Sequence, residues 1–133
     1  MRTLLQPPGW ATPKGYANGV AVKLHAQSQM IFVGGQIGWN AAQQFETDDF
    51  VAQCKQALQN VLAVLNAAGA GAEHMTRMTW YVVSREEYLA CGRELGAAYR
   101  EVLGKHFPAM TCVEVTGLME SRAKVEIEVT AVV

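Results

Sequence analysis

The chain has 133 residues and a mass of 14.5 kDa, which allows a single domain over residues 1–133. Half of the residues are hydrophobic and 17% are charged, a composition that excludes intrinsic disorder. The net charge of −1, without any run of like charges, gives no electrostatic basis for binding nucleic acid or a membrane surface. A small domain with so few charges predicts that part of its apolar surface faces another subunit.

The cysteines and the N-terminal segment bear on where the protein works. Cys54, Cys91 and Cys112 are odd in number and form no CxxC pair, which favours free thiols in a reducing compartment. The first ten residues contain one arginine and no apolar stretch before two prolines, so they are not typical of a secretory signal. No apolar run approaches the roughly 20 residues that span a bilayer. We therefore expect a cytoplasmic protein with no membrane partner.

The beginning of the chain predicts two strands after an irregular arm. Residues 1–15 hold three of the four prolines, which favours irregular structure. Residues 19–26 and 30–36 are apolar and are separated by a short polar turn, which is typical of paired strands. The second of these, beginning MIFVGG, is apolar at consecutive positions, so we expect burial on both of its faces. Residues 38–45 are predicted to form a loop.

A helix and a strand are predicted next. Residues 47–49 supply N-cap candidates, and Gly69 is a natural end for the helix. The apolar positions between them recur at spacings of three and four, on one face of a helix: Phe50, Cys54, Leu58, Val61 and Leu65. Residues 75–83 then predict a strand with Met78, Trp80 and Val82 on one face.

A second helix is predicted to begin at Ser84 and to end near Gly104. Ser84 opens the capping pattern S-x-x-E, in which a serine side chain satisfies a free backbone N–H. Gly92 and Gly96 lie four residues apart on this helix, a spacing that would let another backbone approach closely.

The last two strands are predicted from alternation. Residues 123–131 alternate strictly between apolar and polar, and residues 110–116 alternate as well. If they form an antiparallel hairpin around residues 117–122, their apolar faces match only in registers of one parity. In one of these registers Cys112 lies opposite Glu126.

The element order predicts an α+β fold, ββαβαββ, with a mainly antiparallel sheet and two helices on one face. The other face is expected to carry a mixture of apolar, thiol and acidic side chains: Met110, Cys112, Glu114, Glu126, Tyr81 and part of residues 30–35. Such a face is too apolar to be left bare and too polar for an ordinary core. We expect it to pack against copies of itself, with pockets where subunits meet.

Most standard chemical motifs are absent. There is no HExxH and no paired Cys/His ligand set, so no metal site is expected. The glycine-rich residues 34–38 lack the lysine of a phosphate loop and the spacing of a dinucleotide-binding turn. The remaining candidate is Glu126, because a carboxylate on a half-apolar face would have a raised pKa and could carry protons. The alternative for Glu126 is a solvated strand residue, and the alternative for Cys112 is a small buried apolar residue.

Five motifs, in this order, carry a resemblance to a known family: GYANG at residues 15–19, VGGQI at 33–37, AAG at 67–69, FPAMTCVEV at 107–115 and KVEIE at 124–128. Together they resemble the Rid family of reactive-intermediate deaminases, also called the YjgF or L-PSP family, over nearly the whole chain. The resemblance implies a chorismate-mutase-like fold and a homotrimer whose sheets face inward, with small-molecule pockets at subunit interfaces. It also implies hydrolysis of short-lived enamines and imines to 2-keto acids and ammonia, without metal or cofactor.

The resemblance assigns roles to individual residues. Tyr16 and Cys112 match pocket residues of the family, and Gly35 matches a backbone position that lines the pocket. Glu126 matches the glutamate that positions or activates the attacking water. Met110 departs from the pattern, because deaminating members carry there an arginine that binds the substrate carboxylate.

A methionine at position 110 has neither charge nor hydrogen-bond donor, so we expect poor deamination of 2-iminopropanoate and 2-aminoacrylate. Arg93 on the second helix is one candidate for a substitute cation, and an exposed surface arginine is the alternative. A less acidic or more extended ligand is another solution, with Met110 and Trp39 forming an apolar wall. Two functions therefore stay open: an imine or enamine hydrolase, or a non-catalytic trimer that binds a metabolite or scavenges reactive species through Cys112. A pI of 6.3 and the lack of a basic stripe give no support for ribonuclease activity.

Overall fold

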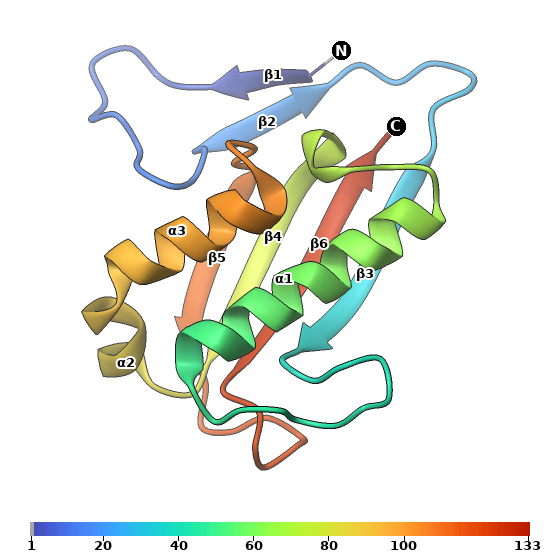
Figure 1. Ribbon diagram of the computed structural model, residues 1–133. Coiled ribbons are helices and arrows are strands. Elements are labelled where there is room, and N and C mark those ends of the chain that lie inside the picture. The colour runs from blue at the N-terminus through green and yellow to red at the C-terminus, as the bar shows by residue number, and fades with distance from the viewer. Residues whose placement is uncertain (1) are drawn as a thin grey trace.

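A computed structural model describes residues 2–133 (Figure 1). In chain order the elements are β1 (Arg2–Leu5), β2 (Gly19–Val22), β3 (Met30–Ile37), α1 (Phe50–Ala67), the 3-10 turn η1 (Ala72–His74), β4 (Met75–Val82), α2 (Arg85–Ala90), α3 (Gly92–Leu103), β5 (Ala109–Glu114) and β6 (Val125–Val132). Helices α1 and α3 cover one face of a four-stranded sheet with the order β3-β6-β4-β5 (Figure 1). The fold is therefore the α+β class that the sequence predicts. No helix among residues 2–133 combines the length and the apolar character needed to cross a bilayer.

The N-terminal arm is more regular than predicted. Residues Arg2–Leu5 form β1, which pairs antiparallel with β2 in a separate two-stranded sheet. The predicted strand over residues 19–26 ends earlier, at Val22. A four-residue strand is too short to show an alternation in the sequence, so its pairing could not be read from the pattern.

The predicted hairpin between the last two strands is wrong. Strand β5 lies at the edge of the sheet and pairs parallel with β4, so that Cys112 lies beside Trp80. Strand β6 lies in the centre, antiparallel to both β3 and β4. Burial explains why β6 rather than β5 takes the central place. The four apolar side chains on one face of β6 are all buried under the helices, whereas half of the side chains of β5 are exposed, as suits an edge strand.

This topology separates two residues that were expected to lie together. Cys112 and Met110 pair with Trp80 and Met78, so they lie on the face covered by the helices. Glu126 pairs with Tyr81, on the opposite and open face. Cys112 therefore does not lie next to Glu126 within one chain.

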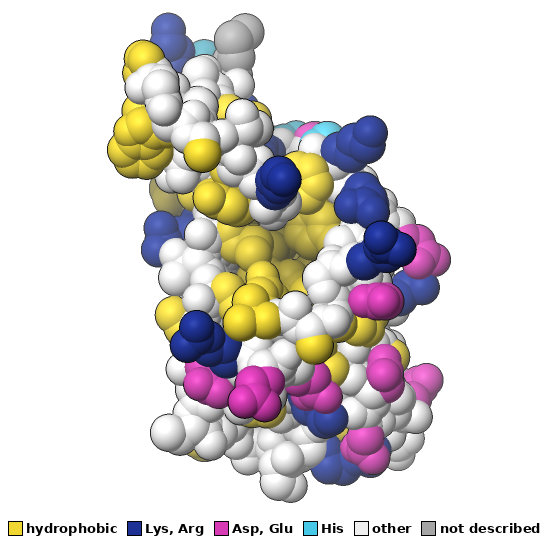
Figure 2. Space-filling model, turned by 90° about the vertical axis from the view of Figure 1, so that its left-hand side faces the viewer, with side chains coloured by type: hydrophobic (Ala, Val, Ile, Leu, Met, Phe, Trp, Pro, Cys, Tyr) yellow, Lys and Arg dark blue, Asp and Glu magenta, His cyan; other side chains and the backbone are white. Residues whose placement is uncertain are grey.

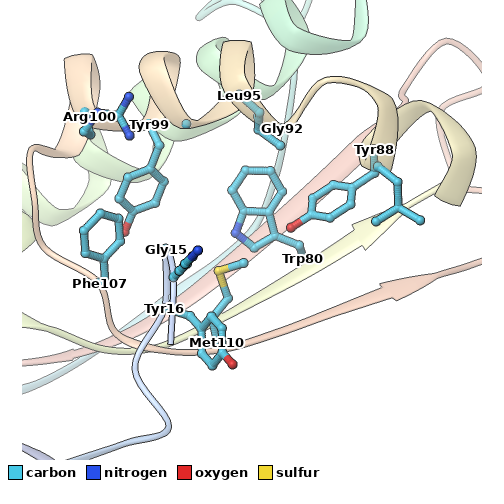
Figure 3. Close-up of a pocket in the computed structure, with 13 residues that line it drawn as sticks. Gly15, Tyr16, Trp80, Tyr88, Gly92, Leu95, Tyr99, Arg100, Phe107 and Met110 are labelled. Atoms are coloured by element: carbon cyan, nitrogen blue, oxygen red, sulfur yellow. The ribbon is translucent and has the colours of Figure 1, made fainter. Parts of the chain in front are cut away.

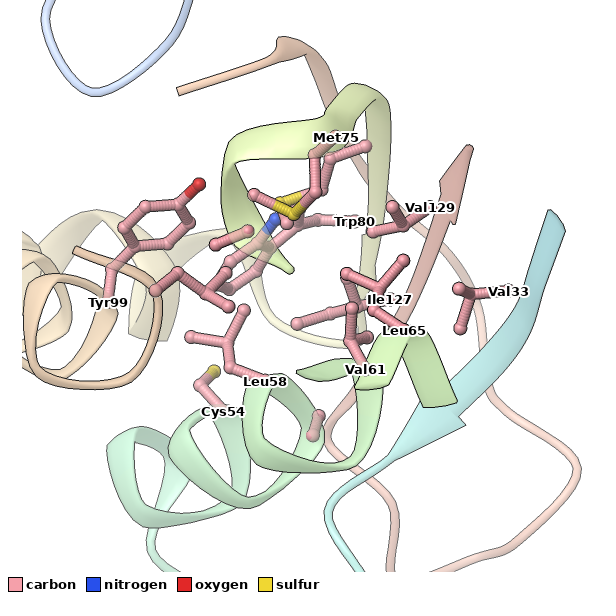
Figure 4. Packing of buried hydrophobic residues seen from close by; sticks show 14 of the residues in the cluster. Val33, Cys54, Leu58, Val61, Leu65, Met75, Trp80, Tyr99, Ile127 and Val129 are labelled. Carbon is pink, nitrogen blue, oxygen red and sulfur yellow. The ribbon is translucent and has the colours of Figure 1, made fainter. Parts of the chain in front are cut away.

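The core forms between α1, α3 and the covered face of the sheet. Helix α1 begins at the predicted cap, where the carboxylate of Asp49 accepts a hydrogen bond from the N–H of Ala52 (2.9 Å). Its end is also as predicted, with Gly69 at φ 74°. The apolar stripe of α1 packs against side chains from β4 and β6, as Figure 4 shows for Leu58, Val61, Leu65, Trp80, Ile127 and Val129.

The second predicted helix is two helices. Ser84 caps α2 as expected, accepting a hydrogen bond from the N–H of Glu87 (3.1 Å). The helix then breaks at Cys91, whose φ of −118° and ψ of 27° are not helical, and α3 begins at Gly92. The glycine lowers helix propensity at this point by about 1 kcal/mol relative to alanine, which favours a break there. The break turns α2 out of line with α3 (Figure 1).

The open face of the sheet carries apolar side chains that nothing in the described chain covers. Ile31 and Val33 of β3 are buried, but Phe32 is 71% exposed and Met30 is 53% exposed. The expectation that this strand is buried on both faces is therefore wrong for the chain on its own. Val113 of β5, at the opposite edge of this face, is also exposed, and the two strands between these edges carry polar side chains there, among them Glu126 and Thr79.

Candidate functional site

The predicted site residues fall into two groups on opposite faces of the sheet. Gly35 and Glu126 lie together on the open face. Tyr16 and Met110 lie around a cavity on the face covered by α2 and α3. A complete site that contains both groups is not formed within residues 2–133.

A bulge in β3 brings Gly35 against Glu126. Val33 pairs with Val129, but the next pair joins Gln36 to Ile127, so β3 contains one additional residue. A Cβ atom at position 35 would lie 2.0 Å from Oε2 of Glu126, far closer than two such atoms can approach. Glycine is therefore required at position 35 for the carboxylate of Glu126 to occupy this place.

The neighbouring carboxylate on β6, that of Glu128, already accepts a hydrogen bond within the chain. The hydroxyl of Tyr81 donates a hydrogen bond to Oε1 of Glu128 (2.7 Å). This hydrogen bond favours the protonated phenol and raises the pKa of Tyr81. Within residues 2–133 Glu126 has no hydrogen-bonded or ion-paired side chain of its own, so its carboxylate is available to a ligand.

The cavity on the covered face has a volume of about 430 Å³, within the range of small-molecule sites. It is lined by residues of the N-terminal arm, β4, the helices α2 and α3, and the start of β5: Lys14, Gly15, Tyr16, Trp80, Tyr88, Leu89, Gly92, Leu95, Gly96, Tyr99, Arg100, Phe107 and Met110. Figure 2 shows it as a hollow with an apolar floor and with Lys and Arg side chains near its rim. Among residues 2–133, no aspartate or glutamate lines it.

Five of the thirteen lining residues are aromatic, and their rings face the cavity from several sides (Figure 3). The rings of Tyr99 and Phe107 stack with centroids 5.2 Å apart, and the rings of Trp80 and Tyr88 meet edge to face at 6.2 Å. Burial raises the pKa of Tyr88 to about 12, so its hydroxyl stays protonated at neutral pH. The hydroxyl of Tyr99 is satisfied by the backbone carbonyl of His106. These rings thus give the cavity neutral and largely apolar inner walls.

Gly92 and Gly96 contribute space to the cavity rather than a site for a second backbone. A Cβ atom at position 92 would meet nothing within 4 Å. At position 96 the nearest atom is Nη1 of Arg100, whose side chain lies over that glycine. The expected close approach of another backbone is therefore not seen within this chain.

The structure places basic side chains differently from the sequence-based expectation. Arg93 is exposed on α3 and does not line the cavity, whereas Lys14 and Arg100 do. Trp39 is also absent from the lining, and its ring packs against Phe45 at 5.8 Å. The proposed wall of Met110 and Trp39 is therefore not formed in one chain.

Cys112 is half-buried against the core, behind the cavity wall. Burial raises the pKa of its thiol, and a hydrogen bond with Tyr88 opposes this only in part. Burial also raises the pKa values of Cys54 and Cys91. Because the thiolate is the nucleophile, none of the three cysteines has the environment of a reactive thiol.

We expect iodoacetamide to alkylate Cys112 more slowly at pH 7 than it alkylates glutathione in the same mixture. The reason is that burial holds the thiol in its neutral form, and the rate should rise as the pH increases beyond about 8.5. Peptide mass spectrometry after timed quenching measures the modification at each cysteine. Faster labelling of Cys112 than of glutathione would show an activated thiol and contradict this expectation.

Comparison with known proteins establishes the family. The family model described as Endoribonuclease L-PSP matches residues 11–133. A RutC family protein of Haemophilus influenzae is 34% identical over 103 residues, which are 77% of this chain and 78% of that protein. The chain belongs to the Rid family.

A further relative and a solved structure support the same family and the same fold for this Rid protein. A 2-iminobutanoate/2-iminopropanoate deaminase of Escherichia coli is 34% identical over 106 residues, covering 77% of this chain and 79% of the relative. A crystal structure of the Rid protein YyfB from Yersinia pestis matches with a TM-score of 0.82 and 28% identity, over 99% of this chain and 98% of that one. Family membership and fold are thus shown together.

The sequence did not reveal the aromatic cavity of this Rid protein. Tyr88, Leu95 and Tyr99 have the spacing of an apolar helix face, and this pattern predicts core burial equally well. The available signal was the pair Gly92 and Gly96 on the same helix, because two missing side chains beside large aromatic ones leave space. Trp80 was assigned to the buried face of its strand, which is where it lies, but nothing in the alternation of that strand indicates that it also lines a cavity.

Proposed function

We propose that this Rid protein is an imine or enamine deaminase that works in a site shared between subunits of a homotrimer. The proposal rests on one observation: the missing side chain at Gly35 leaves room for the Glu126 carboxylate on the open face of the sheet, with no other side chain of the described residues bound to it. A relative of similar length carries the name of an imine deaminase. Imine deaminase function is supported at the level of the family, and the substrate and the residue roles are part of this proposal.

The reaction needs one group that moves protons. Water adds to the imine carbon while the Glu126 carboxylate accepts a proton from that water, which gives a tetrahedral carbinolamine. The carboxyl then returns this proton to the nitrogen, the regenerated carboxylate moves the hydroxyl proton of the carbinolamine to the nitrogen, and the C–N bond breaks to release ammonia and the carbonyl compound. Water and imine are consumed in equal amounts, and Glu126 ends in its starting form. An enamine enters the same sequence after protonation on carbon.

The trimer is proposed from the uncovered apolar area on the sheet. Phe32 and Met30 on β3 and Val113 on β5 are exposed although they are large apolar side chains. Packing three copies with these faces inward would cover them and would bring Glu126 of one copy toward the β5 edge of the next. Tyr16 and Met110 lie near that edge, so the site would be completed by a neighbouring subunit.

Met110 sets the expected selectivity. The methionine cannot pair with a substrate carboxylate, so imines that depend on such a contact at this position should be poor substrates. We expect slow turnover of 2-iminopropanoate and faster turnover of imines with larger apolar groups.

The second candidate function is metabolite binding without catalysis. The cavity that contains Tyr16 and Met110 has no carboxylate in its lining, which favours binding over turnover if no neighbouring subunit supplies Glu126. Scavenging through Cys112 has less support, because burial raises the pKa of that thiol.

A coupled assay distinguishes these functions. An amino-acid oxidase generates imines from a series of amino acids, and semicarbazide captures the imine that survives in the presence of the purified protein. We expect faster loss of imines with large side chains, little effect on 2-iminopropanoate, and at least a tenfold gain on 2-iminopropanoate for Met110→Arg. Light scattering should give three times the chain mass. Failure to accelerate the loss of any imine would favour the binding function, and rapid turnover of 2-iminopropanoate by the unaltered protein would refute the role given to Met110.

A further inference from the structure

We propose that the cavity between the N-terminal arm, α3 and β5 binds an aromatic carboxylate whose ring bears an oxygen acceptor, such as a 4-hydroxyphenyl acid. Three independent features define this ligand: the aromatic walls, an unpartnered donor deep in the cavity, and cations at its rim. Binding itself does not depend on the proposed hydrolase. Its use as the substrate pocket of that hydrolase rests on the proposed function.

The size and the walls of the cavity select a flat apolar group. A cavity of about 150 Å³ lined by apolar side chains holds a benzene molecule, so a volume of about 430 Å³ holds a ring together with a short side chain. The stacked pair of Tyr99 and Phe107 lies on one side and the ring of Trp80 on the other (Figure 3). Flat aromatic walls favour offset or edge-on contact with an aromatic ligand.

The indole of Trp80 supplies a specific polar contact. Its Nε1 is buried and has no hydrogen-bond acceptor among residues 2–133. Trp80 is only 2% exposed, and Figure 3 shows the nitrogen edge of its ring turned toward the cavity on the side of Met110 and Gly15. A buried donor without an acceptor is unfavourable, because it has lost its hydrogen bonds to water without gaining another. An oxygen on the ligand ring that accepts from this N–H would recover that energy.

The rim of the cavity supplies the charge that Met110 lacks. Lys14 and Arg100 both line the opening, and neither forms a salt bridge within residues 2–133. The cavity lining contains no acidic side chain that would repel an anion. A carboxylate at the rim would accept charge-assisted hydrogen bonds from Arg100 while the ring of the ligand enters the cavity. Arg100, rather than Arg93, is therefore the cation that replaces the arginine missing at position 110.

Calorimetry with three stable ligands tests each feature separately. We expect 4-hydroxyphenylacetate to bind about fivefold more tightly than phenylacetate, because only the first accepts a hydrogen bond from Trp80. The neutral alcohol 4-hydroxyphenylethanol should bind at least tenfold more weakly than the acid. Equal affinity of the two acids would refute the Trp80 contact, and equal affinity of acid and alcohol would refute the role of the rim cations.

Variants locate the site. Arg100→Gln should weaken binding of both acids at least tenfold and leave binding of the alcohol unchanged. Gly92→Leu places a side chain into open space within the cavity and should abolish binding. Ala97→Leu adds the same side chain to an exposed position of the same helix, outside the cavity lining, and should have no effect. Retained binding in Gly92→Leu would overturn the proposal, as would loss of the trimer in this variant alone, since the cavity would then hold a neighbouring subunit.

Separate measurements of ligand binding and of imine turnover distinguish this inference from the proposed function. Tight binding of 4-hydroxyphenylacetate without acceleration of any imine would leave the cavity assignment intact and refute the hydrolase. Turnover of imines that is unaffected by Gly92→Leu or by added 4-hydroxyphenylacetate would leave the hydrolase intact and refute the use of this cavity as its substrate pocket.

Discussion

Alanine at position 35 is expected to lower kcat for imine hydrolysis by at least 100-fold while the protein remains folded. The added methyl group would lie 2.0 Å from Oε2, 2.7 Å from Cδ and 2.9 Å from Cγ of Glu126, so the whole carboxylate must move. The glutamate side chain is flexible and can rotate away, which keeps the effect on stability small. A catalytic group displaced by about 1 Å loses on the order of 100-fold in rate. Steady-state kinetics and thermal unfolding measure the two effects separately.

The adjacent glycine provides a matched control. A Cβ atom at Gly34 would meet nothing within 4 Å, so Gly34→Ala adds the same atom to the same bulge without touching Glu126. Glu126→Gln, which keeps the shape of the side chain and removes its basicity, should reproduce the loss seen in Gly35→Ala. If Gly35→Ala and Gly34→Ala kept equal activity, the position of Glu126 would have no catalytic importance.

Leucine in place of Gln53 is expected to lower the free energy of unfolding by about 3 kcal/mol. The Gln53 side chain is fully buried near the start of α1 and joins three parts of the chain. Its Nε2 donates to the carbonyls of Thr47 and Arg122 (3.0 Å each), and its Oε1 accepts from the N–H of Lys124 (2.9 Å). Leucine keeps the volume but leaves all three backbone groups without their partner, which is costly in a buried place.

A neighbouring glutamine serves as the reference for this measurement. Gln59 is exposed on the same helix and its side chain forms no hydrogen bond within residues 2–133, so Gln59→Leu should change stability by less than about 0.5 kcal/mol. Urea unfolding followed by circular dichroism gives both values. A loss below about 1 kcal/mol in Gln53→Leu would show that water replaces the lost hydrogen bonds, contrary to the buried position of this side chain.

The elements with strong periodicity were predictable from the sequence, but their pairing was not. Helix α1 begins and ends where its cap residues and apolar stripe place it, and β6 lies where the alternation places it. The alternation of β5 is just as regular, yet it carries no information on whether β4 or β6 lies beside it. The pairing is set by which apolar face the helices cover, and this depends on contacts between residues far apart in the chain.

For the candidate site too, the residues could be named from the sequence, but not which of them lie together. The close approach of Gly35 to the Glu126 side chain within one chain was not predicted, although both residues were named, because the bulge that produces it depends on the register of β3 with β6. Tyr16 and Met110 come together because the arm crosses β5, where Ala17 bridges to Ala109. No local pattern indicates such a crossing. The place of Arg100 in the cavity lining was missed because the cavity exists only in the folded chain.

The central place of β6 has a consequence for how the chain acquires its structure during synthesis. Strands β3 and β4 do not pair with each other, and β6, which pairs with both, follows them in the chain. While a ribosome is still adding residues before Val125, the half built on β3 and the half built on β4 and β5 have no strand between them. Their unpaired edges and uncovered apolar side chains are then accessible to chaperones or to other nascent chains. The sheet closes only when residues 125–132 have left the ribosome, so these edges stay unpaired until this segment has been made.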